Sequence, residues 1–146
     1  MRTNEQAYNQ LSKFIGTWNT KGLIPSSNGS PEIKIIGTDN YKWITDGFFL
    51  LHTADVIIGN HNIKTHEIIG YDSLNNHYTM QHYNSKGNSG FMTATVNDGL
   101  WTFSGDSLRF EGGFNKHGDV FSGIWEQTTD GKTWSHLMHI KLSKTK

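Results

Sequence analysis

The sequence lacks cysteine, has only two prolines, and carries no excess charge, with 13 basic and 13 acidic residues in 146. Without cysteine, disulfides and thiolate chemistry are excluded, while the redox compartment stays open. Balanced charge offers no basic surface for nucleic acid or an anionic membrane, so neither is an expected partner. No apolar run approaches the roughly 18 residues of a membrane span. Residues 1–10 are polar and lack the apolar segment of a signal peptide.

These absences favour a soluble, cytoplasmic protein, and they leave open an export signal that has been removed. The length predicts one domain over residues 1–146, long enough for a substantial core. Sixteen glycines indicate a turn-rich chain, and five Trp, five Tyr and eight Phe supply large buried areas although only 34% of the residues are hydrophobic. A low aliphatic content is typical of a barrel with a ligand-filled interior, so it favours a cavity.

Regularly spaced turn signals divide the chain into short segments that alternate apolar and polar residues. Asp46-Gly47, Asp98-Gly99 and Asp130-Gly131 are dipeptides that adopt the positive φ of tight hairpins. The segments predict an all-β, closed antiparallel up-and-down barrel of about ten strands, because closure removes the exposed edges of so long a sheet. The expected strands are 16–24, 33–44, 48–58, 63–71, 77–84, 90–96, 100–104, 107–114, 119–128 and 133–142.

One amphipathic helix is expected before the first strand. Thr3 and Gln6 have the spacing of a capping box. The following apolar residues recur at helical spacing, and they are Ala7, Tyr8, Leu11, Phe14 and Ile15. We expect this stripe to cover one end of the barrel, with the loop of residues 26–31 at the other end.

Strand parity predicts which side chains face the lumen, because successive side chains point to opposite faces. In the last strand, Trp134, His136, Met138, Ile140 and Leu142 form the expected interior face. Other strands contribute aromatic, thioether and histidine side chains. The candidate ligand-binding residues are His66, Tyr78, Met80, His82, Trp101, Trp125, His136 and Met138.

Three motifs resemble a family of uncharacterised bacterial lipocalin-like (calycin-type) barrel proteins. They are Phe14-Ile15-Gly16-Thr17-Trp18, Ile69-Gly70-Tyr71-Asp72 and Asp130-Gly131-Lys132-Thr133-Trp134, and they occur in the expected order over nearly the whole chain. The resemblance implies a lipocalin-like barrel in which the tryptophan after the helix plugs one end. It implies no particular activity.

A second resemblance is confined to the last strand. The segment of residues 135–142, Ser-His-Leu-Met-His-Ile-Lys-Leu, is similar to the final strand of nitrobindin-type haem barrels. It implies haem as an alternative cofactor, with His136 as the iron ligand inside the barrel. Thr20 stands where that family has a glycine after its tryptophan, which departs from the pattern. The alternative reading of His136 is a core histidine with a hydrogen bond across the lumen.

No metal site is expected, although the sequence contains eight histidines. Pairs such as His77 and His82, or His136 and His139, are separated by odd numbers, which places each pair on opposite faces of a strand. No nucleophile elbow, phosphate loop or zinc-protease motif occurs, so no catalytic residue is predicted.

The sequence therefore favours binding of a small apolar or amphipathic molecule in the lumen. Haem binding and an isomerase- or cyclase-type barrel enzyme are the alternatives, and a homodimer is left open.

Overall fold

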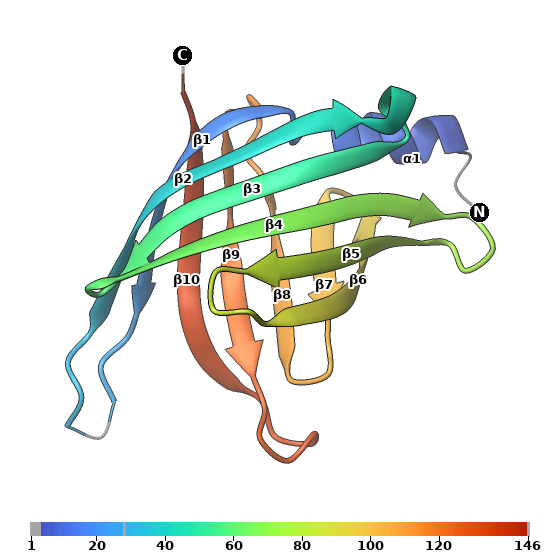
Figure 1. Cartoon of the computed structure of the whole chain (residues 1–146). Coiled ribbons are helices and arrows are strands. Elements are labelled where there is room, and N and C mark those ends of the chain that lie inside the picture. Colours follow the sequence, from blue (N-terminus) through green and yellow to red (C-terminus); the bar gives the residue numbers. More distant parts are fainter. Residues whose placement is uncertain (1–3, 28, 146) are drawn as a thin grey trace.

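The computed structural model describes residues 4–27 and 29–145, and its strands form one closed antiparallel barrel (Figure 1). A helix, α1 (Asn4–Ser12), precedes the ten strands. The strands are β1 (Gly16–Ile24), β2 (Ile33–Ile44), β3 (Phe49–Ile58), β4 (His61–Asp72), β5 (His77–Asn84), β6 (Ser89–Asn97), β7 (Leu100–Ser104), β8 (Leu108–Phe114), β9 (Val120–Gln127) and β10 (Ser135–Lys144), with a short 3-10 turn η1 (Thr45–Gly47) between β2 and β3. The prediction of a ten-stranded closed barrel with an N-terminal helix is confirmed.

Each strand pairs with the next one along the chain, and β10 returns to β1 to close the barrel. At this seam Trp18 lies opposite Lys144 and Gly22 lies opposite Ile140. In Figure 1, β2 to β5 cross β8 to β10 at a steep angle, as expected when a strongly twisted sheet curls onto itself. The expected strand bounds differ from the observed ones by no more than two residues.

The hairpin turns follow the dipeptides that the sequence marks. Asp98 and Gly99 have φ values of 50° and 81° and join Asn97 to Leu100, as a two-residue hairpin requires. Asp46 and Gly47 also have positive φ, whereas at the third dipeptide only Gly131 does.

Asp130 stabilises this third turn by another means. Its carboxylate accepts hydrogen bonds from the backbone N–H groups of Lys132 and Thr133, both at 2.8 Å. These hydrogen bonds lower the pKa of Asp130 to about 2, and the N–H of Thr133 has the larger effect.

The helix α1 covers one end of the barrel through its apolar face. Ala7 and Leu11 are buried there, and Phe14 follows them just beyond the helix. The Tyr78 hydroxyl donates a hydrogen bond to the Ala7 carbonyl of the helix at 2.9 Å, and the Trp18 indole N–H donates to the Phe14 carbonyl, just beyond the helix, at 2.8 Å. The predicted N-cap, Thr3, lies outside the described residues. The β1–β2 loop lies at the opposite end of the barrel (Figure 1).

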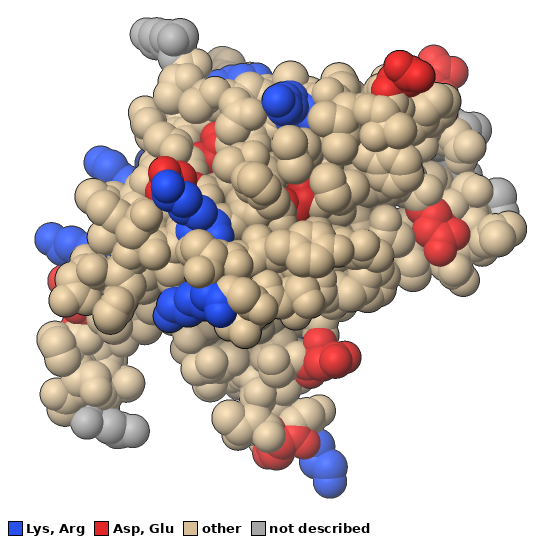
Figure 2. Space-filling view, in the orientation of Figure 1, with Lys and Arg blue, Asp and Glu red and all other residues tan. Residues whose placement is uncertain are grey.

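Charged side chains are dispersed on the outside of the barrel. Figure 2 shows Lys, Arg, Asp and Glu scattered over the face in view, most of which is uncharged. Among the residues that the structure describes, no helix has the length and hydropathy that a membrane-spanning helix needs.

Candidate functional site

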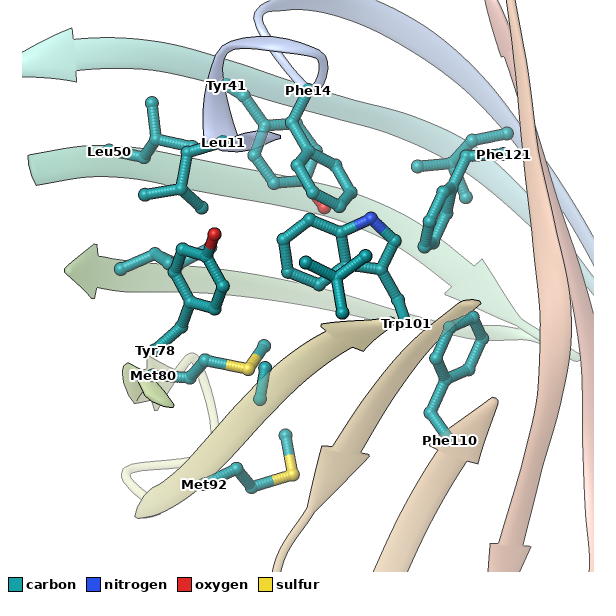
Figure 3. Packing of buried hydrophobic residues seen from close by; sticks show 14 of the residues in the cluster. Leu11, Phe14, Tyr41, Leu50, Tyr78, Met80, Met92, Trp101, Phe110 and Phe121 are labelled. Carbon is teal, nitrogen blue, oxygen red and sulfur yellow. The ribbon is translucent and has the colours of Figure 1, made fainter. Parts of the chain in front are cut away.

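The barrel encloses a cavity of about 320 Å³. Its wall is largely apolar and aromatic, and Figure 3 shows many of these side chains directed into the interior beneath Leu11 and Phe14. The Phe14 ring links two parts of the wall, since its centroid lies 5.2 Å from that of Tyr41 and 5.1 Å from that of Trp101. Leu11 of α1 and Phe14 just beyond it therefore form part of the cavity wall, and the helix also closes the barrel end.

Four adjacent strands, β1 to β4, place a polar cluster on one side of this cavity. The cluster comprises Thr20, Asp39, His52 and Glu67, and all four line the cavity. Strand pairing brings them together. Glu67 on β4 lies directly opposite His52, and Asp39 on β2 lies two residues from Tyr41, the residue opposite His52, on the same inward face. Thr20, Asp39 and Glu67 are buried, with at most 7% of each residue exposed.

The His52 imidazole lies between the two carboxylates. Its Nε2 lies 2.6 Å from Asp39 Oδ2 and its Nδ1 lies 2.9 Å from Glu67 Oε1. The Thr20 hydroxyl donates to the other oxygen of Asp39. The Tyr41 ring stacks on the imidazole with a centroid distance of 4.1 Å and an interplanar angle of 6°. These contacts fix the imidazole on three sides.

The two carboxylates make His52 a cation at neutral pH. Burial lowers the pKa of His52, but the hydrogen bonds and negative charges of Asp39 and Glu67 outweigh burial and raise it from 6.5 to about 9. The pKa of Tyr41 is raised well above 10 by burial and, to a smaller extent, by the charges of Asp39 and Glu67, so its hydroxyl stays protonated. The cluster therefore contains an imidazolium and a neutral phenol beside two carboxyl groups.

The raised pKa of His52 predicts a dependence of stability on pH. A group whose pKa is higher in the folded than in the unfolded protein stabilises the fold. This stabilisation is complete below the pKa of the unfolded state, and it is lost as pH rises to the pKa of the folded state. For His52 this window runs from about pH 6.5 to about pH 9. We expect the free energy of unfolding to fall by on the order of 3 kcal/mol across it.

Urea denaturation at several pH values, on the natural protein and on His52→Ala, measures this effect. The difference between the two curves isolates His52 from the other titrating groups. If the difference does not change between pH 6 and pH 10, the proposed charge state of His52 is wrong.

The cavity brings together five of the eight side chains that the sequence predicts as ligand-binding. These five are Tyr78, Met80, Trp101, Trp125 and Met138. Whether they contact a ligand stays a prediction. His82 is half-buried on the inward parity of β5, but it covers Gly90 and does not line the cavity.

His66 and His136 are exposed and do not line the cavity, contrary to expectation. On β4 the side chains that face the cavity are those of Thr65, Glu67 and Ile69. His66 alternates with them along the strand and therefore points outward. On β10 the register shifts between His136 and Met138, where an irregularity interrupts the pairing with β9. An extra residue in one strand reverses the alternation of side chains, so His136 turns outward while Met138 points inward.

Sequence reasoning missed the polar cluster. A signal was present in β3. All its alternate residues are apolar except the histidine, and they are Leu50, His52, Ala54, Val56 and Ile58. A histidine within such a face is a candidate interior residue. Its two carboxylate partners could not be identified, because they come from separate strands whose register the sequence does not state.

The geometry does not fit haem ligation by a histidine. The exposed His136 does not reach the cavity, and His52 is the sole histidine among the described residues that line it. Both ring nitrogens of His52 are bonded to carboxylates, so neither is available to an iron atom or for direct proton exchange with a ligand. Within the described chain, no group of three or more His, Asp or Glu side chains is arranged to hold a metal ion.

Comparisons with known proteins support the fold. The structure is similar to a protein from M. tuberculosis whose solved structure is titled "Crystal Structure of Rv2717c from M. tuberculosis", with a TM-score of 0.70 and 10% sequence identity. The similarity covers 96% of this chain and 98% of the other. No curated protein matches the sequence. The model of the DUF1579 family, described as proteins of unknown function, matches residues 3–120. That match spans most of the barrel, and the chain therefore belongs to the DUF1579 family.

Proposed function

We propose that the protein binds a small, mainly apolar molecule in the barrel lumen. The observation that carries this proposal is the cavity of about 320 Å³, which has an apolar wall and polar groups on one side. A few convergent polar groups in an apolar cavity are characteristic of small-molecule sites.

The physical basis of binding is burial of the ligand's apolar surface. Each Å² removed from water contributes about 25 cal/mol, and aromatic side chains such as Trp101 and Phe110 provide large contact areas. The cluster around His52 supplies orientation, since it gathers four polar side chains on one side of the cavity, where a polar group of the ligand can form hydrogen bonds.

Fluorescence titration with N-phenyl-1-naphthylamine, a neutral apolar probe, tests this function. The matched variants are Ala54→Phe and Thr53→Phe, which add the same ring to neighbouring residues of β3. Ala54 lines the cavity, whereas Thr53 does not. We expect the natural protein to enhance the probe's fluorescence, Ala54→Phe to weaken binding at least tenfold, and Thr53→Phe to retain it.

Two results contradict the proposal. Absence of binding to the natural protein would remove the lumen as a ligand site for such molecules. Equal binding by a folded Ala54→Phe variant would show that the probe lies elsewhere.

A further inference from the structure

The charges that line the cavity do not balance. Asp39 and Glu67 supply two carboxylates and His52 supplies one imidazolium, and no Lys or Arg is present among the described residues of the wall. Counted by residue type, the wall therefore has two acidic side chains and one basic side chain, a formal charge of minus one. A buried charge without a partner is unfavourable, because it has lost its hydration.

Two oxygen atoms beside His52 have no hydrogen-bond partner among the described residues, namely Glu67 Oε2 and the Tyr41 hydroxyl oxygen. The other wall groups without such a partner are the Thr65 hydroxyl and the indole N–H groups of Trp101 and Trp125. The His52 bond uses the other Glu67 oxygen, and the contacts of Tyr41 are made through its ring. Every fully buried polar side-chain atom of the described chain has a partner, so these two atoms must be accessible. Both residues are more than nine-tenths buried and both line the cavity. Figure 3 shows the Tyr41 hydroxyl directed towards the interior.

We propose that the cavity selects an apolar molecule that carries one positively charged amine, whose N–H groups bind Glu67 Oε2 and the Tyr41 hydroxyl. This inference rests on the proposed function, since it specifies the chemical class of the same ligand. The ammonium group would compensate the remaining negative charge, and its hydrogen bond to a carboxylate belongs to the stronger, charge-assisted kind. Aromatic rings on the wall also favour a cation, through the negative potential of their faces.

An anionic ligand is disfavoured by the same arrangement. Both N–H groups of the His52 imidazolium are directed at carboxylates, so they are not available to an anion. A neutral alcohol can form hydrogen bonds with the two accessible oxygens but cannot compensate the charge. The expected order of affinity is therefore amine, then alcohol, then carboxylic acid.

Displacement of bound N-phenyl-1-naphthylamine by 4-phenylbutylamine, 4-phenylbutan-1-ol and 4-phenylbutanoate at pH 7 tests this order. The three competitors share one apolar body and differ in the charge of the head group. We expect the amine to displace the probe at a concentration at least tenfold below that of the alcohol, and the acid to be weakest. Glu67→Gln should abolish the preference for amine over alcohol, whereas Glu111→Gln, the same change at an exposed position of β8, should retain it.

The outcomes separate the two proposals. If the alcohol or the acid displaces the probe as well as the amine does, the charge selectivity is wrong and lumen binding stands. If neither the probe nor any competitor binds, both proposals fail. A preference for the amine that persists in Glu67→Gln would overturn the assignment of Glu67, and the series on the natural protein decides the selectivity even if that variant does not fold.

Discussion

His52→Ala is expected to lower the free energy of unfolding by about 3–5 kcal/mol at pH 7, because removing one partner of a buried ionic cluster leaves the others uncompensated. Asp39 and Glu67 would then face each other as two buried carboxylates, with their hydrogen bonds to the imidazole lost. The stacked ring of Tyr41 would also lose its partner. Urea denaturation followed by tryptophan fluorescence measures the change.

His66→Ala is the matched control for this substitution. His66 lies on the adjacent strand β4, but it is exposed, so its removal should change stability by no more than about 0.5 kcal/mol. Replacing both carboxylates in the His52→Ala background, by Asp39→Asn and Glu67→Gln, should restore part of the loss, because it removes the charges that histidine neutralises. Equal stability of the two alanine variants would show that the cluster is not an ionic one.

Trp18→Ala is expected to destabilise the protein by about 3–5 kcal/mol, the cost of removing a buried indole and leaving a cavity. The Trp18 side chain has no exposed surface, and its ring lies 6.0 Å from that of Phe114. Its N–H donates to the Phe14 carbonyl and so joins the barrel to the segment that follows α1. Thermal or urea unfolding monitored by circular dichroism checks this prediction.

Trp18→Phe and Trp134→Ala separate the contributions of this residue. The phenyl ring keeps part of the packing but leaves the Phe14 carbonyl without its donor, which costs about 1–3 kcal/mol. Trp134 is half-buried and lies against the guanidinium of Arg109 at 4.2 Å, so its removal should cost about 1 kcal/mol or less. If Trp134→Ala is as damaging as Trp18→Ala, the plug role of Trp18 is not supported.

The architecture could be predicted from the sequence because its determinants are local. An Asp-Gly pair between alternating segments predicts a tight turn, as at Asp98 and Gly99, and the helix is apparent from the spacing of Ala7 and Leu11. The number of strands and the closure of the sheet follow from a series of such local signals, since a long meander must remove its edges.

The candidate site could be predicted only in part, because it depends on register. Where a strand contains large apolar residues at alternate positions, as with Met80 or Trp101, the inward face was correctly identified. On β4 the inward-facing residues could not be recognised from the sequence. They include Glu67, and an acidic residue is rarely buried without a partner. The partner, His52, lies 15 residues away and is recognisable only once the strands are paired.

The seam between β1 and β10 has a consequence for the order of folding during synthesis. The partner of Trp18 is Lys144, so one edge of β1 stays uncovered until β10 has left the ribosome. The strands from β2 onward can each pair with their predecessor as they emerge, whereas this closure joins the first strand of the barrel to the last and is therefore slow. Until then the nascent barrel presents two open edges, and the pairing of β10 with β1 removes both.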